Sequence, residues 1–328
     1  MRRPTLLLLA SLLAVVVGCD GTGPEPLDAQ VVVSASLGVD EPLPPVALSR
    51  VAPILDVYDP EAVAVDGARV TVTLLAPDGS AEAVYPYAGD ASDRGLYRPD
   101  PTATAVVRPD RRYRLDVAVG DEALTAETLT PPALALLEGP ADAVVYGVGQ
   151  GPELRISRSS TPQRKATFVA TTLALAPAAF DRVTVDGETF YRSVPSPDTF
   201  LPVPIFRRFL ECEDEPAGTI LCAENPRSAS VVTGTSPVIN EANYIDLGDG
   251  SLLVRVPFLG FGYYGPYRVS LVSLDAALEA FVESQLVQGG GSTLSPGEIP
   301  NLVTNVEGGL GVFGSFARVT VRTTIVEP

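Results

Sequence analysis

The side chains that usually carry acid–base and metal chemistry are scarce in this chain of 328 residues, which contains no histidine. That absence excludes Ser-His-Asp and Cys-His nucleophiles, the HExxH zinc site and histidine acid–base catalysis. The chain has neither a G-x-S-x-G elbow nor a G-x-x-x-x-G-K loop, and its single lysine, Lys165, is better interpreted as an exposed hairpin residue than as a Ser–Lys or Schiff-base group. We therefore expect a non-enzymatic protein, although 40 acidic side chains leave a carboxylate-pair hydrolase open.

An acidic run surrounds Cys212, where Glu211, Glu213, Asp214 and Glu215 place four carboxylates within five residues. Carboxylate oxygens are ligands that Ca²⁺ prefers, but this spacing matches no EF-hand loop. A solvated acidic loop is the favoured interpretation, and cation binding by this loop stays open. We expect no metal and no organic cofactor elsewhere in the chain.

Aromatic residues gather between positions 258 and 267, at Phe258, Phe261, Tyr263, Tyr264 and Tyr267. Aromatic faces on a β surface can stack on sugars or on the side chains of a partner. Phe261, Tyr263 and Tyr264 are therefore a candidate binding surface. The alternative is a kinked strand whose aromatic rings fill the core, and this alternative is the stronger of the two.

Glycines recur in the segment Gly308-Gly309-Leu310-Gly311-Val312-Phe313-Gly314. No helix is expected to follow them, so a phosphate-binding loop is disfavoured. Close approach of two backbones, or a bulge before the last strand, explains these glycines better.

The N-terminus has the organisation of a bacterial lipoprotein export signal. Basic residues Arg2 and Arg3 precede an uncharged apolar run over residues 6–17, which is shorter than the roughly 20 residues of a membrane-spanning helix. Val16-Val17-Gly18-Cys19 then resembles a lipobox. We expect residues 1–18 to be removed and Cys19 to carry the lipid, with residues 19–28 as a short tether; an ordinary cleaved signal is the alternative. Attachment through several acyl chains is firm.

The other two cysteines, Cys212 and Cys222, are separated by nine residues. An exported compartment favours their oxidation to a disulfide, which would contribute about 2.5–3 kcal/mol in the chain-entropy model. A two-cysteine metal site is the weaker alternative because no histidine is present to complete it.

Composition indicates a β-rich protein that does not bind nucleic acid. The net charge of −17 repels phosphate backbones, whereas 31 prolines and 29 glycines are typical of many turns. Residues 29–132 contain about seven short strands with frequent turns, which predicts an immunoglobulin-like sandwich. Residues 133–328 predict a second β-rich domain. The strands we expect cover residues 29–36, 45–52, 68–76, 81–87, 95–98, 112–119 and 123–129, then 153–157, 166–175, 182–185, 189–194, 228–232, 252–258, 267–272 and 312–326.

One amphipathic helix is predicted near the C-terminus, over residues 274–288. Ser273 can cap it, Asp275 suits its positive N-terminal end, and a glycine run from Gly289 ends it. Its apolar residues recur at helical spacing and indicate packing on a sheet rather than contact with a membrane.

The order of several segments resembles the bacterial lipoprotein family known as domain of unknown function 4249, typical of the Bacteroidetes and neighbouring phyla. The segments are the lipobox, QVVVSASL (Gln30 to Leu37), VALSRVAP (Val46 to Pro53), DGARVTVTL (Asp66 to Leu74), TAETLTPP (Thr125 to Pro132), YRVSLVSLDAALEAFVESQ (Tyr267 to Gln285) and IPNLVTNVEGGLGVFGSFA (Ile299 to Ala317). The early strand departs from the family pattern at Ser34 and Ala35.

The resemblance implies a role beside TonB-dependent outer-membrane receptors. We therefore expect a non-enzymatic lipoprotein of the cell envelope, anchored to the outer membrane and serving as a binding or assembly partner of such a receptor or transport system. A carbohydrate-binding lipoprotein that uses the aromatic residues is the alternative.

Overall fold

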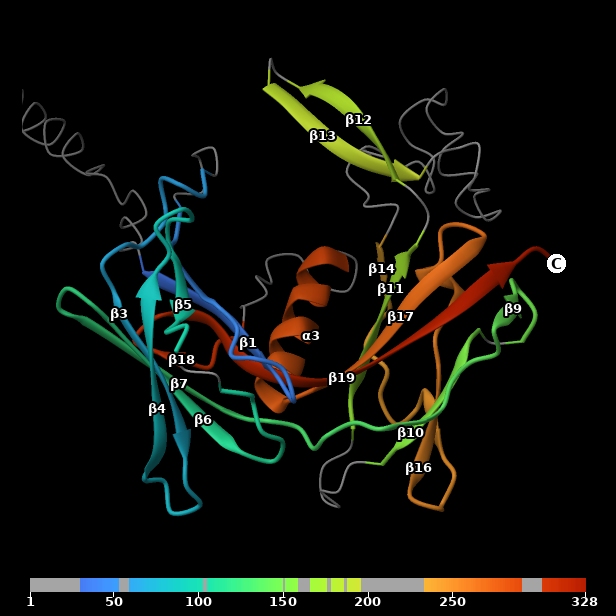
Figure 1. The fold of residues 1–328 in the computed structure, drawn as a ribbon, viewed down its shortest axis with the longest axis horizontal. Coiled ribbons are helices and arrows are strands. Elements are labelled where there is room, and N and C mark those ends of the chain that lie inside the picture. The colour runs from blue at the N-terminus through green and yellow to red at the C-terminus, as the bar shows by residue number, and fades with distance from the viewer. Residues whose placement is uncertain are drawn as a thin grey trace, which may run out of the picture.

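A computed structural model describes residues 30–52, 59–102, 105–149, 151–158, 166–175, 178–185, 188–195, 233–290 and 303–328. Within these ranges the protein is mainly β, with α3 (Ala276–Gly290) as its α-helix and η2 (Phe258–Gly260) as a short 3-10 turn. The predicted fold class, a β-rich protein with one helix near the C-terminus, is confirmed. Figure 1 shows two groups of strands with α3 between them and one long strand, β19, running from one group to the other.

Thirteen strands form one continuous sheet, in the order β14-β11-β17-β19-β1-β2-β5-β4-β3-β6-β7-β18, with β9 paired to the far end of β19. Its strands from the first half of the chain are β1 (Val31–Gly38), β2 (Val46–Arg50), β3 (Arg69–Leu75), β4 (Ala81–Gly89), β5 (Leu96–Pro99), β6 (Arg112–Val119), β7 (Glu122–Leu129) and β9 (Ala143–Val145). Those from the second half are β11 (Phe168–Ala174), β14 (Thr233–Thr235), β17 (Gly265–Leu274), β18 (Val306–Glu307) and β19 (Leu310–Val326).

Two smaller sheets complete the described strands. One has the order β15-β16-β10-β8 and consists of β8 (Leu136–Glu138), β10 (Glu153–Ser157), β15 (Tyr244–Asp246) and β16 (Ser251–Arg255). The other is the hairpin of β12 (Ala178–Val185) and β13 (Glu188–Pro195).

The first core lies inside the curled half of the large sheet. Strands β1 and β6 alternate buried apolar and more exposed residues, the period that a half-buried strand requires, whereas β3 is buried at most of its positions. The predicted inward set of β3, Val70, Val72 and Leu74, is confirmed, since all three are at most 1% exposed. Tyr97 and Tyr113 are also buried, and their hydroxyls donate to or accept from backbone groups, so burial leaves no polar atom unpaired.

The C-terminal segment also belongs to this first core, which the predicted boundary at residue 132 does not anticipate. Val306 of β18 and Phe313 of β19 are buried in it. β18 pairs antiparallel with β7, and β19 pairs parallel with β1, so the C-terminal segment joins the two sides of the curled half of the sheet. A fully buried phenylalanine contributes about 2–3 kcal/mol of transfer free energy, so this segment is a substantial part of the first core.

The second core lies between the other half of the large sheet and the four-stranded sheet. β19 continues into it with Val319, Val321 and Ile325, while β10 and β16 contribute residues such as Ile156 and Val254. One strand therefore supplies side chains to both cores, and the two predicted β units share β19.

The glycine run before and within β19 is explained by close backbone approach, as predicted. Gly311 has φ +102°, and a Cβ built there would lie 1.9 Å from the carbonyl oxygen of Val33. At Gly309 a Cβ would lie 2.7 Å from the carbonyl oxygen of Val31, and at Gly314 it would lie 2.8 Å from Cβ of Leu278 on α3. These glycines let β1 and α3 pack directly against β19.

Helix α3 begins two residues later than predicted, and Asp275 caps it in place of Ser273. Ser273 is still part of β17, where it pairs with Ala317. The Asp275 carboxylate accepts a hydrogen bond from the backbone N–H of Leu278 at 2.9 Å, the geometry of an N-cap. The predicted cap is wrong because β17 continues to Leu274, two residues beyond the end of the strand predicted over residues 267–272.

Candidate functional site

Most of the predicted site residues lie outside the described residues. These are the lipid-bearing Cys19, the cysteines Cys212 and Cys222, the acidic run from Glu211 to Glu215, and Lys165. Their predicted roles therefore stay predictions.

The aromatic stretch fills the second core and does not form an exposed platform. Phe261 and Tyr263 are 1% and 5% exposed, and Tyr264 is half-buried beside Tyr146. The rings of Phe261 and Tyr267 lie edge to face, with centroids 5.0 Å apart. Because a stacking surface needs accessible ring faces, Phe261 and Tyr263 cannot supply one here, and the core-filling interpretation describes them.

The outward face of the sheet above the second core carries a different set of residues. Strand β17 buries Tyr267, Val269 and Leu271 in the second core, and β19 buries Val319 and Val321 there. The residues between them on each strand therefore point to the opposite face of the sheet, away from this core. We call this surface the arginine face; it consists of Thr171, Leu173, Arg268, Ser270, Arg318, Thr320 and Arg322.

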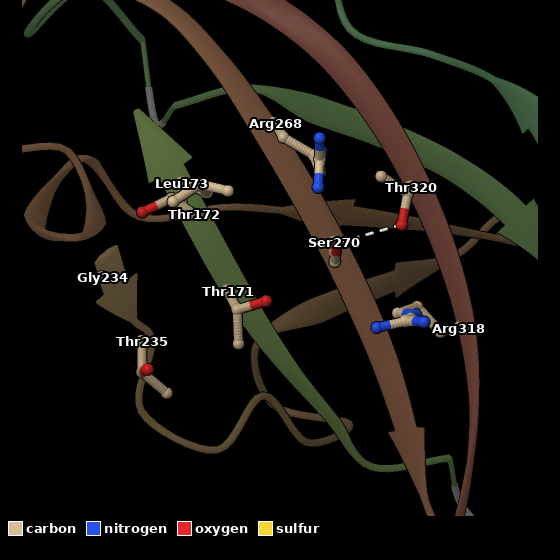
Figure 2. A pocket seen from close by; sticks show the side chains of 9 residues that line it. All are labelled: Thr171, Thr172, Leu173, Gly234, Thr235, Arg268, Ser270, Arg318 and Thr320. Atoms are coloured by element: carbon tan, nitrogen blue, oxygen red, sulfur yellow. Dashed lines mark hydrogen bonds between the residues drawn. The ribbon is translucent and has the colours of Figure 1, made fainter. Parts of the chain in front are cut away.

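Strand register sets the arrangement of the arginine face. Thr171, Ser270 and Thr320 form one row across β11, β17 and β19, and Leu173, Arg268 and Arg322 form the next row. The Ser270 and Thr320 hydroxyl oxygens lie 2.9 Å apart and share a hydrogen bond. Figure 2 shows Arg268 and Arg318 on opposite sides of this hydroxyl pair.

A hollow of about 510 Å³ lies over the first row and over Leu173, Arg268 and Arg318, and β14 borders it through Gly234 and Thr235. Arg322 is not among the residues that line it. Gly234 fits close to η2, because a Cβ there would lie 2.3 Å from the carbonyl oxygen of Gly260. The hollow lies on a sheet face and is lined mainly by guanidinium groups and hydroxyls, together with Leu173.

Positive charge on the arginine face is only partly neutralised. Arg318 forms an ion pair with Glu41 at 2.5 Å and lies over the ring of Phe316, 5.8 Å from its centroid. Arg268 and Arg322 form no ion pair with any residue that the structure describes, and they are direct cross-strand partners. Like charges opposite each other on a sheet repel, so this pair does not serve stability.

The arginine face can bind anions but offers no general acid or base. Arginine stays protonated at any physiological pH and donates in a planar fork that fits carboxylates and phosphates. Among the described residues, no group of three or more histidine, cysteine, aspartate or glutamate residues is placed to hold a metal ion. Binding is therefore the chemistry that this arrangement supports.

Sequence reasoning missed the arginine face, although a signal for it exists. Residues 318–322 read Arg-Val-Thr-Val-Arg, in which polar and apolar residues alternate as they do in a strand with one solvent-exposed face. Which strand lies opposite, and so which charges meet, depends on a register that no local pattern specifies.

The described part of the chain is thus a mainly β protein in which two cores share one strand and one sheet face is cationic. The chain belongs to the family described as a domain of unknown function (DUF4249), whose model matches residues 24–322. This match confirms the family resemblance of the segments from Gln30 to Ala317, and it begins after the lipobox.

Other comparisons add no functional information. None of the curated proteins matches the chain. One similar solved structure is a trypsin-activated alpha-2-macroglobulin from Escherichia coli, 10% identical over 75% of this chain, with a TM-score of 0.18. This chain spans 14% of that protein's length, and so low a score carries no argument. Within the described ranges, no helix has both the length and the apolar character needed to cross a membrane.

Proposed function

We propose that this protein is a non-enzymatic lipoprotein of the cell envelope. It is held on the outer membrane by a lipid on Cys19, and it is a binding or assembly partner of an outer-membrane receptor or transport system. The observation that carries the proposal is the arginine face, on which Arg268 and Arg322 form no ion pair with any described residue and Arg318 pairs with Glu41. Such a surface is suited to binding and unsuited to acid–base chemistry.

The expected tether would join the membrane to the first core. Residues 19–28 would span at most about 35 Å when fully extended, and the first described strand, β1, belongs to the first core. The arginine face belongs to strands above the second core. A partner in the membrane would therefore have to reach the half of the sheet that covers the second core.

Membrane attachment is tested by Cys19→Ser in the producing bacterium. We expect the wild-type protein in the membrane fraction with acyl chains on its N-terminal peptide, and the variant in the soluble envelope fraction. Mass spectrometry of the N-terminal peptide reads the modification directly. An unmodified Cys19 in a membrane-bound protein would contradict the lipid anchor.

The receptor partnership is tested by site-specific photo-crosslinking in living cells. A photoreactive amino acid replaces Leu173 on the arginine face, and a matched one replaces Leu137, which is 53% exposed on β8 of the four-stranded sheet. We expect the Leu173 position to yield an adduct that mass spectrometry identifies as an outer-membrane receptor, and Leu137 to yield none. An equal yield of this adduct at both positions, or none at either, would refute the partnership through this face.

A further inference from the structure

We infer that the arginine face binds a short saccharide that carries anionic groups, with Arg268 and Arg322 holding one anionic group and the hydroxyls of Ser270 and Thr320 contacting the sugar. The inference deepens the proposed function by naming a ligand class for the same surface. The inference rests on the proposed function in one respect, the location at the cell envelope, where such a saccharide would be present. Saccharide binding by the arginine face does not depend on that location.

The first step concerns charge that the fold leaves uncompensated. In a chain with 40 acidic and 23 basic residues, an arginine has many carboxylates available to it. Two arginines of β6 have such partners, since Arg114 pairs with Asp116 at 3.0 Å and Arg112 lies 3.8 Å from Glu127. On the arginine face no outward position of β11, β17 or β19 carries a carboxylate. Arg268 and Arg322 are therefore available to an external anion.

The second step concerns geometry. Directly opposed residues on antiparallel strands have Cβ atoms about 4.5–5.5 Å apart, so the guanidinium groups of Arg268 and Arg322 can reach the same oxyanion. Each guanidinium can donate two parallel hydrogen bonds to a carboxylate or a phosphate. Two such groups form a stronger anion site than either arginine alone.

The third step concerns the row beside the arginine pair. Thr320 is exposed and Ser270 is 8% exposed, and their hydroxyls share one hydrogen bond, so the pair keeps further sites at which a sugar hydroxyl can donate or accept. Arg318 lies beyond them, about 13 Å along β19 from Arg322 at the usual rise of a strand. Because Arg318 already pairs with Glu41, a ligand with an anionic group at the Arg268–Arg322 pair and hydroxyls along the Ser270–Thr320 row fits this arrangement.

The fourth step concerns the length of the ligand. The net charge of −17 repels long polyanions such as nucleic acids. A short anionic saccharide meets less of this repulsion.

The test is calorimetric titration of the full-length mature lipoprotein in neutral detergent at low ionic strength. The probes are tetragalacturonate, which carries carboxylates, and a bisphosphorylated glucosamine disaccharide, which represents a glycolipid headgroup. Maltotetraose is the neutral control, and tetraglutamate represents an acidic peptide. We expect one of the anionic saccharides to bind more tightly than both controls, and which one it is identifies the anionic group.

The variants assign the binding to the arginine face. Arg268→Gln combined with Arg322→Gln should weaken binding at least about tenfold, because charge-assisted hydrogen bonds to the ligand are lost. Arg112→Gln combined with Arg114→Gln removes the same charge from β6 and should change the affinity less than about twofold. The face double variant should also melt at or above the temperature of the wild type, since it relieves a repulsion.

Four results would overturn the inference. They are no binding of either anionic saccharide, equal or tighter binding of tetraglutamate, an equal loss of affinity in the β6 double variant, and a face double variant that binds as the wild type does. None of them bears on the receptor adduct from Leu173, so failure of this inference and failure of the proposed function are distinguishable.

Discussion

Asp275 is only 2% exposed, although its carboxylate is among the most polar groups in the chain. Its two oxygens accept from the Leu278 N–H of α3 at 2.9 Å and from the Thr128 hydroxyl of β7 at 2.5 Å. Because the Thr128 proton is used, Thr128 accepts from the Ser315 hydroxyl of β19, 2.7 Å away. Burial of this carboxylate is tolerated because it is fully hydrogen-bonded and lies at the positive end of a helix.

Replacing Asp275 should therefore destabilise the protein more than removing an ordinary helix cap. Asp275→Ala removes the cap and leaves the buried hydroxyl of Thr128 without its acceptor, so we expect a loss of about 2–4 kcal/mol in the free energy of unfolding. Asp275→Asn keeps a cap oxygen and should cost less. Urea unfolding of both variants measures the two losses, and equal losses would contradict the assigned hydrogen bonds.

Tyr267 should make the protein sensitive to alkali. Burial raises the pKa of Tyr267 to about 12, against an ordinary value of 10.0. The folded state therefore holds this proton more tightly than the unfolded state, and the resulting stability is complete below pH 10 and is lost as pH rises through 12. Above pH 10, Tyr267→Phe should lose stability less steeply than the wild type.

The measurement is the free energy of unfolding at pH 8 and at pH 11 for both proteins. At pH 8 the variant should be the less stable one, because the Tyr263 backbone N–H loses the Tyr267 oxygen as its acceptor at 2.9 Å. Tyr87 also has a pKa raised by burial, so the variant keeps part of the alkaline sensitivity. Parallel pH profiles for the two proteins would show that Tyr267 ionises normally.

At the scale of elements, β19 depends on glycine where it meets β1. The Cβ of an alanine at Gly311 would collide with the backbone of Val33, which cannot move without breaking the pairing of the two strands. We expect Gly311→Ala to lower the free energy of unfolding by about 3 kcal/mol. Gly120→Ala is the matched control, since Gly120 also has positive φ, +57°, but nothing within 4 Å, and it should cost about 1 kcal/mol. Thermal or urea unfolding measures the stability that each variant loses. Equal losses would mean that the positive φ alone, and not the collision with Val33, sets the cost of replacing Gly311.

Local pattern predicts most strands of this fold because alternation is visible within a few residues. The buried sets of β1 and β3 follow directly from VVVSAS and RVTVTL, and the helical spacing around Leu278 and Phe281 indicates α3. Element ends are less predictable, as Ser273 shows, because tertiary pairing with β19 extends β17 beyond the point where local capping preference would end it.

The pairing of strands that lie far apart in the chain could not be predicted from the sequence. β1 lies beside β19 in parallel, nearly 280 residues further along the chain, and no local signal specifies that partner or its register. The candidate site suffers from the same limit. Arg268 and Arg322 are ordinary strand residues until the pairing of β17 with β19 places them opposite each other.

At the scale of the whole molecule, the two cores are coupled through β19. Phe313 is buried in the first core and Val321, eight residues later on the same strand, is buried in the second. The Asp275 hydrogen bonds tie β7, α3 and β19 together at the same junction. Loss of β19 from either core would therefore remove packing from the other as well, which favours one cooperative unfolding transition over two.

This coupling predicts that the N-terminal β unit cannot fold by itself. A fragment of residues 29–132 keeps β1 to β7 but lacks Val306 and Phe313, and it exposes the edges of β1 and β7 that β19 and β18 cover. We expect this fragment to lack a cooperative thermal transition and to bind hydrophobic dye. A synthetic peptide of residues 303–317 should restore the transition in proportion to its concentration, because it supplies both missing strands.

A Phe313→Ala version of the peptide is the matched control, and it should restore folding more weakly because the cavity that it leaves costs about 3–5 kcal/mol. Circular dichroism and calorimetry follow both mixtures. A fragment that melts cooperatively without any peptide would show that the first core is complete without β19. Rescue by both peptides to the same degree would show that the backbone pairing of β18 and β19, and not the buried Phe313 ring, closes the first core.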